Sequence, residues 1–256
     1  MSQSIVSFKG ISKSFSSKAG LVIAIENVTF EVAVGEFVVL VGPSGCGKST
    51  LLNLAAGMIP PSSGAVQYRG EDVTGLNLRT GFMTQEDHLL PWRDVVGNIA
   101  TPLEIRGDDP AGISDRVDRL IQLVGLTGFE KSYPSQLSGG MRKRTALARL
   151  LAYDPETLLL DEPFAALDAQ LRLSMQTELF RICRSLNKTI LFVTHDLDEA
   201  VALADRILVF TKRPGTIQRV VSSPLEKNRD IPHLRHDPAY SRATAALWDL
   251  VLAEVC

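Results

Sequence analysis

The 256-residue sequence has few cysteines and no long hydrophobic run. Its three cysteines, Cys46, Cys183 and Cys256, stand far apart and form no metal-type pair, so we expect reduced thiols in a cytosolic protein. The apolar stretches, such as those at 37–41 and 207–210, are as long as strands and fall short of the ~18 residues that a membrane helix needs. The first ten residues contain no hydrophobic stretch typical of a secretory signal. Any membrane association is therefore expected to depend on a partner.

The sequence also lacks a strong net charge. Its 27 basic and 29 acidic residues leave a formal charge of −2, which gives no global signal for nucleic-acid binding. The one local basic stretch, at 142–144, is predicted to be a solvated helix face. With 45% hydrophobic and 22% charged residues, the composition is that of a globular protein that can bury a sizeable core.

Strand-like and helix-like patterns alternate along the chain. Apolar alternation or continuous apolar runs predict strands at 4–8, 21–32, 37–41, 65–68, 158–160, 189–194 and 206–210. Apolar spacing of three and four predicts helices at 48–56, 113–124, 139–152, 168–186 and 197–204. Strands that alternate with helices indicate a parallel sheet with helices on both faces. The stretch 86–150 indicates an inserted helical lobe, and residues 222–256 are polar and end in a short amphipathic run.

The most informative segment is GPSGCGKS at 42–49, which fits the phosphate-binding loop (P-loop) pattern G-x-x-x-x-G-K-[S/T] between a predicted strand and a predicted helix. Its glycines let backbone N–H groups surround a phosphate chain at the positive end of a helix. Lys48 is expected to reach the β- and γ-phosphates, and Ser49 to bind Mg²⁺. The alternative is a glycine-rich turn with a chance lysine. The predicted nucleotide-binding residues are Gly42, Pro43, Ser44, Gly45, Cys46, Gly47, Lys48, Ser49 and Thr50.

A second candidate site is TLLLDE at 157–162, a buried-strand run that ends in two acids. Ligands of open α/β sheets bind at the carboxyl ends of the strands, where these acids would lie. We expect Asp161 to hold Mg²⁺, and Glu162 to polarise the attacking water as a general base. The alternative is a pair of solvated loop acids.

Between these two segments, LSGGM at 137–141 precedes a predicted helix. With the P-loop and the paired acids in this order, the chain resembles the ABC ATPases, whose signature motif is LSGG. In that family the motif closes over ATP held by the other subunit. The resemblance therefore implies that Ser138, Gly139 and Gly140 bind nucleotide across a head-to-tail dimer. A glycine-rich segment that opens a helix can bind an anion, as the P-loop does.

Further positions match the family in order. Gln85 resembles the Q-loop glutamine that senses Mg²⁺ and the permease, which implies a catalytic and metal-binding role. The tripeptide at 166–168 resembles the D-loop and implies that Asp168 lies at the nucleotide. His195 resembles the switch histidine that contacts the γ-phosphate, although a lone histidine is more often structural. Phe15 takes the place of the aromatic residue that stacks on adenine, where the family more often has tyrosine, and it could equally be a core residue.

The resemblance covers about residues 5–220 and implies an α/β fold. Its expected parts are a P-loop NTPase (RecA-like) core, an antiparallel β lobe and an inserted helical lobe. We expect the ATPase domain at 1–221, with the helical signature lobe at 85–150, and a short C-terminal tail at 222–256. ATP and Mg²⁺ are the implied cofactors. The implied partners are transmembrane permease subunits and a second copy of the chain or a paralogous ATPase, with no nucleic acid.

Three stretches narrow the resemblance to the nitrate/sulfonate/taurine importer group: LLPW within 85–107, KRPGTIQRVV at 212–221 and RDIPHLRHDPAY at 229–240. They imply an ATPase subunit at the cytoplasmic face of the membrane, which works with a permease and, indirectly, a periplasmic or extracellular solute-binding protein. We expect residues 89–93 to dock the permease. The alternative is that Leu89, Leu90 and Trp92 fill the gap between the lobes.

Three residues depart from the pattern of this group. Lys143 stands where the group usually has glutamine, and Thr84 stands where an aromatic residue is usual. Thr157 opens the strand before the paired acids with a polar side chain. None of these changes removes a predicted catalytic group.

Two other functions stay open, and both are ABC ATPases. A soluble ATPase that acts on nucleic acid or the ribosome usually carries two cassettes or a long coiled-coil insertion, and the sequence shows neither. The ATPase of an exporter is disfavoured only by the resemblance of the LLPW stretch and the tail. A GTPase is disfavoured because no N-K-x-D motif occurs. The transported solute is not encoded, because the ATPase subunit does not touch it.

Overall fold

The computed structural model describes residues 3–17, 20–165 and 167–252. The strands are β1 (Ser4–Ser17), β2 (Gly20–Ala33), β3 (Phe37–Val41), β4 (Ser63–Tyr68), β5 (Glu71–Asp72), β6 (Thr80–Met83), β7 (Thr157–Asp161), β8 (Thr189–Val193), β9 (Arg206–Phe210) and β10 (Ile217–Ser222). The helices are α1 (Lys48–Ala55), α2 (Val95–Arg106), α3 (Pro110–Leu123), α4 (Gly139–Ala152), α5 (Ala169–Ser185), α6 (Leu197–Leu203) and α7 (Pro238–Leu252), with 3-10 helices η1 (Pro134–Gln136) and η2 (Ile231–His236). None of the helices in these ranges combines the length and apolar character that a membrane span requires.

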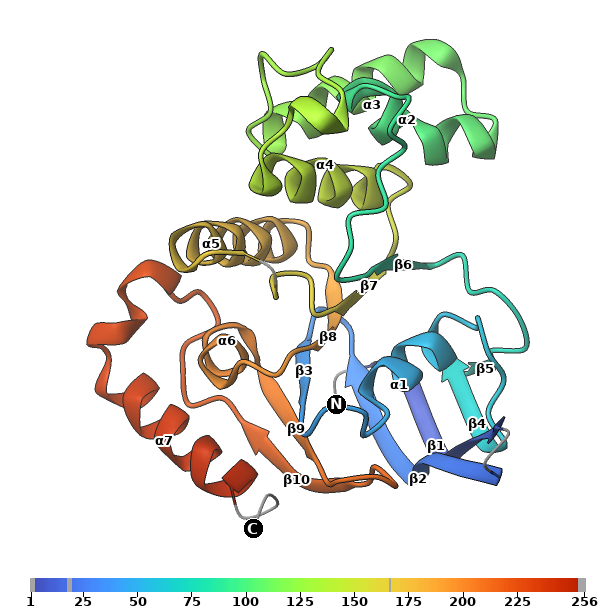
Figure 1. The fold of residues 1–256 in the computed structure, drawn as a ribbon, viewed down its shortest axis with the longest axis vertical. Helices are drawn as coiled ribbons and strands as arrows, with labels where there is room; N and C mark the ends of the chain where they lie inside the picture. Colours follow the sequence, from blue (N-terminus) through green and yellow to red (C-terminus); the bar gives the residue numbers. More distant parts are fainter. Residues whose placement is uncertain (1–2, 18–19, 166, 253–256) are drawn as a thin grey trace.

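Six strands form the central sheet in the order β10-β9-β3-β8-β7-β6, and all neighbours are parallel except β9 and β10 (Figure 1). The inner strands are buried because hydrophobic layers cover both faces. In β3, Phe37, Val39 and Val41 contact one layer, whereas Val38 and Leu40 contact the other. Parallel order brings the carboxyl ends of β3, β7 and β8 to the same edge, where ligands of open α/β sheets bind.

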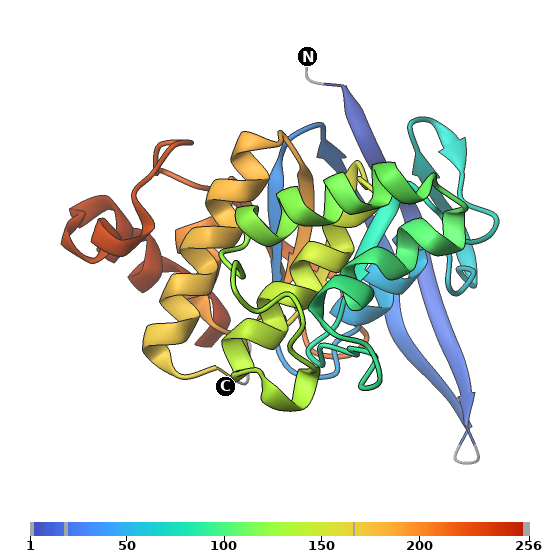
Figure 2. The same ribbon diagram turned by 90° about the horizontal axis from the view of Figure 1, so that it is seen from above.

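Different layers cover the two faces of this sheet. Helix α1 and the antiparallel sheet β2-β1-β4-β5 share a buried cluster with one face. Helices α4, α5 and α6 pack with the other face. The prediction of helices on both faces is confirmed, and the antiparallel sheet that the family resemblance implies is present. Figure 2 shows that the long β1–β2 hairpin extends beyond the rest of the fold.

Helices α2, α3 and α4 lie together at the top of Figure 1. They pack on one another, and a single buried cluster continues from them to α5 and the sheet. Helix α2 begins after Asp94, whose carboxylate accepts the N–H of Gly97, and ends at Gly107 in the left-handed conformation. Caps of this kind satisfy backbone groups that a helix end leaves free. This helical part therefore shares one core with the sheet.

The C-terminal residues form a longer helix than the sequence indicates. Helix α7 has 15 residues, where only a short amphipathic run is predicted. Tyr240 and Leu247 of α7 are buried with Ile231 and Leu234 of η2, in the same cluster as α5 and α6. The tail predicted at 222–256 thus contains a helix that packs on the core.

One further expectation needs correction, and four elements were not predicted. The basic stretch at 142–144 is not a solvated helix face, because Lys143 is 5% exposed and Arg142 and Arg144 are only partly exposed. These side chains bond to neighbouring segments, which explains how the helix can bury Lys143 and partly bury its two neighbours. The elements β5, β6, α2 and β10 were not predicted. Helix α2 contains Pro102, and β6 is a four-residue strand with a glycine, so both lack a clear apolar period.

Candidate active site

The P-loop joins β3 to α1, as predicted. Gly47 precedes the helix with φ of 99°, and a Cβ there would lie 2.4 Å from Ile25 Cγ2. A Cβ on Gly42 would lie 2.8 Å from the carbonyl oxygen of Phe210. The loop therefore packs closely against β2 and β9, and glycine is needed for this packing as well as for access of a phosphate chain.

Lys48 is the first residue of α1 and is 5% exposed. Its ammonium donates to the carbonyl oxygens of Gly42, at 2.8 Å, and Pro43, at 2.9 Å. The buried charge is thus satisfied by the loop itself, which closes into a ring around the lysine. This places a cation where the motif expects phosphate groups.

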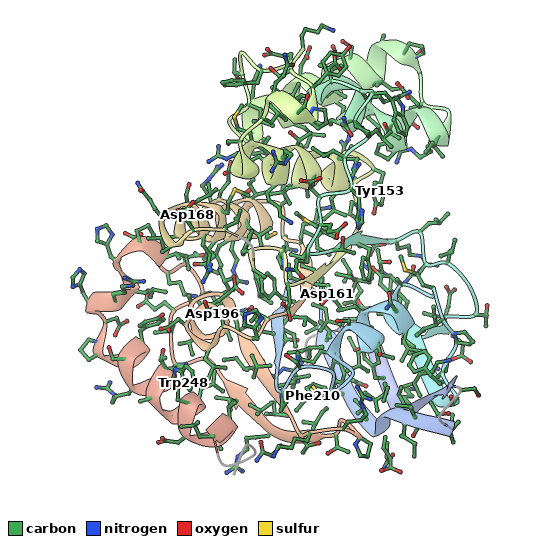
Figure 3. The ribbon with its side chains drawn as sticks, viewed as in Figure 1. Tyr153, Asp161, Asp168, Asp196, Phe210 and Trp248 are labelled. Carbon is green, nitrogen blue, oxygen red and sulfur yellow. The ribbon has the colours of Figure 1, made fainter. Side chains whose placement is uncertain are left out.

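Ser49 and Asp161 meet at the edge of the sheet. The Ser49 hydroxyl donates to Asp161 Oδ1 at 2.9 Å, and Figure 3 shows Asp161 at the end of β7. Burial raises the pKa of the Asp161 carboxyl, and the hydrogen bond from Ser49 opposes this shift. A hydroxyl and a carboxylate are hard oxygen ligands of the kind that Mg²⁺ prefers. The pair therefore fits a bound Mg²⁺.

Glu162 follows Asp161 but turns to a different neighbour. Its φ of 47° is uncommon for a residue with a Cβ, and its N–H donates to the carbonyl of Val193 on β8. Its carboxylate Oε2 lies 3.0 Å from His195 Nδ1. Both side chains are accessible, with exposed fractions of 29% for Glu162 and 60% for His195. The predicted base and the predicted switch histidine are therefore partners at an open edge of the sheet.

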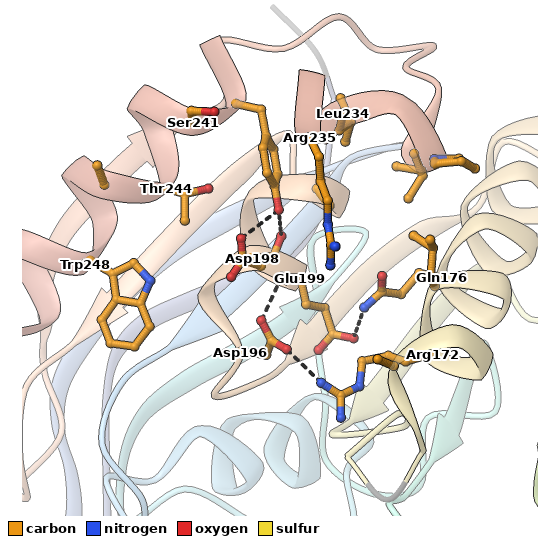
Figure 4. Close-up of a pocket in the computed structure, with 17 residues that line it drawn as sticks. Arg172, Gln176, Asp196, Asp198, Glu199, Leu234, Arg235, Ser241, Thr244 and Trp248 are labelled. Atoms are coloured by element: carbon orange, nitrogen blue, oxygen red, sulfur yellow. Dashed lines mark hydrogen bonds and ion pairs between the residues drawn. The ribbon is translucent and has the colours of Figure 1, made fainter. Parts of the chain in front are cut away.

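Hydrogen bonds from α5 and α7 fix the segment that follows His195. Asp196 caps α6 by accepting the N–H of Glu199 at 3.1 Å, and it also accepts from Arg172 of α5 at 3.1 Å (Figure 4). The Tyr240 hydroxyl of α7 donates to Asp198 at 2.9 Å. The residues that form these bonds line a cleft of about 650 Å³ between α5, α6, η2 and α7. Arg172 was not among the predicted site residues, and Tyr240 entered only as the last residue of the stretch 229–240.

Gln85 comes two residues after β6 and its side chain is exposed. Because β6 is the parallel neighbour of β7, with Met83 opposite Leu160, this loop starts near the edge that carries Asp161. The backbone carbonyl of Gln85 accepts a hydrogen bond from Lys143 of α4. The Q-loop is therefore attached to the helix that follows LSGG.

The LSGG segment begins α4. Ser138 caps this helix by accepting the N–H of Met141 at 3.3 Å, and a Cβ on Gly140 would lie 2.5 Å from Leu171. Asp168 likewise caps α5 through the N–H of Leu171, at 3.0 Å. Across the described ranges, no hydrogen bond or ion pair joins Ser138, Gly139, Gly140 or Asp168 to the P-loop. Ala166, the first residue of the predicted D-loop, lies outside the described residues.

Phe15 lies on β1 opposite Val22 and is 41% exposed. The ammonium of Lys13 lies 5.3 Å from the centre of its ring. Phe15 is therefore not a core residue, and its partly exposed ring has the Lys13 cation over one face. Cys46 and Cys183 are buried free thiols, as expected, and Cys256 lies outside the described residues.

The turn between β9 and β10 also contacts the P-loop, which the sequence analysis did not foresee. Arg213 Nε donates to the carbonyl of Gly45 at 3.1 Å. A Cβ on Gly215 would lie 1.9 Å from the carbonyl oxygen of Cys46, so glycine is required there. The R-P-G sequence after an apolar strand was visible, but its proximity to the P-loop depends on β9 lying beside β3.

Comparisons with known proteins agree with this geometry. The family model described as ABC transporter matches residues 25–165. An uncharacterised ABC transporter ATP-binding protein of Methanocaldococcus jannaschii is 46% identical over 222 residues, which cover 87% of this chain and 83% of the relative. An aliphatic sulfonates import ATP-binding protein of Bacillus thuringiensis is 44% identical over 225 residues, 88% of each chain.

Solved structures give the same result. A dimeric ATP-binding cassette in a post-hydrolysis state, bound to ADP and phosphate, superposes with a TM-score of 0.76 at 28% identity. The superposed region covers 87% of this chain and 100% of the solved cassette. A component of a Clostridium perfringens ABC transporter complex shares the fold, with a TM-score of 0.78 at 22% identity. The chain belongs to the ABC transporter family and has the P-loop NTPase fold of its ATP-binding subunits.

Proposed function

We propose that this chain is the ATP-hydrolysing subunit of an importer, and that it dimerises on ATP to drive a separate membrane permease. The observation that carries the proposal is the grouping at one sheet edge of Lys48, the Ser49–Asp161 pair at 2.9 Å and the Glu162–His195 pair at 3.0 Å. These are a phosphate-binding cation, a pair of Mg²⁺ ligands and a general base with its partner. Relatives named as sulfonate import ATP-binding proteins support the importer assignment.

Each side chain has a defined task in hydrolysis. The P-loop N–H groups and Lys48 bind the β- and γ-phosphates, and Glu162 accepts a proton from the attacking water. His195 contacts the γ-phosphate and holds the Glu162 carboxylate in place. Ser49, Asp161 and Gln85 would hold Mg²⁺, which when bound neutralises charge on the phosphates. Phe15 and Thr50 belong to the same proposed nucleotide site.

The site is proposed to be completed by a second protomer. Ser138, Gly139, Gly140 and Asp168 do not bond to the P-loop of their own chain, and they lie at the starts of α4 and α5. A helix start offers free N–H groups to an anion. In a head-to-tail dimer, these residues would meet the ATP bound by the partner. The solved cassette with 28% identity is itself a dimer bound to ADP and phosphate.

The permease is proposed to bind the loop at 89–93. Trp92 is 71% exposed, and its neighbour Pro91 is also exposed. Asn98 of α2 is fully buried and fixes the loop, because its side chain bonds to both the N–H and the carbonyl of Leu90. Leu89 is buried in the core, so the expectation that it takes part in docking was wrong. The contact surface therefore centres on Trp92.

We propose that the solute is an aliphatic sulfonate or a related small anion, and that the subunit lies at the cytoplasmic face of the membrane. Reconstitution with the cognate permease and solute-binding protein in liposomes tests this. Binding protein loaded with an alkanesulfonate should stimulate ATP hydrolysis. If only binding protein loaded with nitrate stimulates ATP hydrolysis, the sulfonate is not the solute. If no loaded binding protein stimulates ATP hydrolysis, or if solute moves outward, the importer assignment is wrong.

A further inference from the structure

Three of the basic residues of α4, Arg142, Lys143 and Arg149, bond to the Q-loop at residues 85–88. Arg149 donates to the carbonyl oxygens of Asp87 and His88, each at 2.7 Å. Arg142 Nε lies 3.2 Å from a carboxylate oxygen of Asp87. Lys143 donates to the carbonyl of Gln85. Helix α4 thus contacts three of the four residues from 85 to 88.

Lys143 is the most unusual of these cations because it is 5% exposed. Burial lowers the pKa of its ammonium, and the carboxylate of Asp87 opposes this shift. A buried ammonium is costly unless it has acceptors, so the bond to Gln85 is worth more than a bond at the surface.

Helix α4 connects the Lys143–Gln85 bond to the LSGG segment. Ser138 caps the start of α4, and Lys143 lies five residues further along the same helix. At 1.5 Å per residue the two are about 7.5 Å apart along the axis of one rigid element. A displacement of the LSGG segment is therefore passed to the Gln85 backbone without an intervening loop.

We propose that Lys143 is a positioning residue, which ties Gln85 to the helix that begins at the LSGG segment, so that closure of the dimer places the Gln85 side chain. The inference rests on the role proposed above for Gln85. The Gln85 side chain itself is exposed, and its backbone is the part that Lys143 fixes. A misplacement of ~1 Å in a catalytic group can cost about 10²-fold in rate.

The first test replaces Lys143. Lys143→Met keeps an apolar stem but removes the donor, and Lys143→Gln restores an N–H donor. In Lys143→Met we expect kcat for ATP hydrolysis to fall about 10- to 100-fold. KM for ATP should change less than about twofold, because the P-loop is untouched. Hydrogen exchange should increase at amides 84–90 and stay unchanged in β3 and α1. Equal kcat values for the Met and Gln variants would overturn the proposal.

A matched control lies next in the sequence. Arg144 is on the same helix, but it donates to the carbonyl of Val124 and forms an ion pair with Glu178, away from the Q-loop. Arg144→Met should lower the melting temperature and leave kcat and exchange at 84–90 unchanged. If Arg144→Met and Lys143→Met lower kcat equally, loss of stability explains both and the proposal is wrong.

A double-variant cycle separates this inference from the proposed function. Because Lys143 acts through Gln85, Gln85→Ala and the Gln85→Ala/Lys143→Met pair should have the same kcat. If Gln85→Ala leaves kcat unchanged, the role of Gln85 fails. If Gln85→Ala lowers kcat and the second substitution lowers it by the full factor again, Gln85 keeps its role and the Lys143 proposal is overturned.

Discussion

At the scale of residues, Asp161 and Glu162 are adjacent in the sequence but contact different partners. Asp161 ends β7 and bonds to Ser49, whereas Glu162 adopts a φ of 47° and turns to His195. Such a conformation is strained for a residue with a Cβ and persists because neighbouring bonds hold it. The bond from the Glu162 N–H to Val193 is one of these. The strain therefore places the proposed base beside its partner.

Glu162→Gln should retain ATP binding and lose turnover. The amide preserves the shape of the side chain but cannot accept a proton from water. General-base catalysis contributes about 10²–10⁴-fold, so ATP hydrolysis should fall by about that factor. The variant should accumulate as an ATP-bound dimer in gel filtration. Hydrolysis at the wild-type rate would remove Glu162 from this role.

A second prediction at this scale concerns Glu199 and pH. Burial raises the pKa of Glu199 from 4.5 to about 7, although Gln176 donates to it at 3.0 Å. A raised pKa means that the folded state binds more protons than the unfolded state between these two values. The free energy of unfolding should therefore fall as pH rises from about 4.5 to about 7, by up to ~3 kcal/mol.

The matched variant is Glu199→Gln, which keeps the oxygen that accepts from Gln176. It should be more stable than the wild type at pH 8, and the two should converge near pH 4. Chemical denaturation across this range measures the difference. A pH dependence that survives in Glu199→Gln would assign the effect to another group.

At the scale of elements, most strands and helices follow from the sequence. Strands β3 and β9 have the predicted bounds because each is a buried run between clear turn signals, and helix α4 has them because its apolar residues recur at helical spacing. Helix α2 has an Asp94 cap and a Gly107 stop that the sequence displays, but Gly97 and Pro102 inside it obscure the apolar period. Local signals predict elements well when the apolar pattern along them is not interrupted.

In the candidate site, too, local motifs were predictable and long-range contacts were not. The P-loop and the paired acids were predictable because each motif is local and lies between a strand and a helix. The contacts of Lys143 with Gln85 and of Arg213 with Gly45 join residues 58 and 168 positions apart. Partners at such separations depend on sheet order and helix packing, which the pattern of a single sequence does not specify. The basic stretch was misread for this reason.

The loop at 89–93 gives a prediction at the element scale. Trp92→Ala should weaken permease binding by about 2 kcal/mol or more, because buried tryptophans dominate interface energies. The isolated subunit should lose less than about 0.5 kcal/mol of stability, since Trp92 is 71% exposed. A permease pull-down and a melting curve on the same protein measure both quantities.

Trp248 is the matched control. It is the other tryptophan of the chain, is 47% exposed, and lies on α7 (Figure 3). Trp248→Ala should leave permease binding intact. If Trp92→Ala lowers the melting temperature by several degrees and binds permease normally, Trp92 has a packing role and the docking surface lies elsewhere.

At the scale of the whole molecule, the proposed site is divided between two separate parts of the chain. The P-loop and the paired acids lie at the edge of the central sheet, whereas LSGG lies at the start of α4. Among the residues that the structure describes, no hydrogen bond joins LSGG to the P-loop. Two protomers arranged head to tail would place each LSGG segment on the partner's P-loop. A symmetric dimer then contains two shared sites.

Two inactive variants test this sharing. Lys48→Ala should weaken ATP binding by roughly 1.5–3 kcal/mol, because a charge-assisted contact is lost. Ser138→Arg should bind ATP as a monomer and fail to hydrolyse it, because the bulky cation obstructs the closed dimer. Ser138→Ala is its comparison: it loses the same helix cap, worth about 1 kcal/mol, and the hydroxyl proposed to meet ATP, but it adds no bulk, so it should lower hydrolysis less than Ser138→Arg does.

Mixing the two variants gives the decisive measurement. In a mixed dimer, one site combines both lesions and the other has an intact P-loop and an intact LSGG segment. Equal mixing makes half of the dimers mixed, so about a quarter of the wild-type sites are restored. ATP hydrolysis should therefore return to at most about that level, from near zero in each variant alone. If heterodimers form, as shown by pull-down with two affinity tags, and no activity returns, each protomer hydrolyses ATP with its own residues and the shared site is rejected.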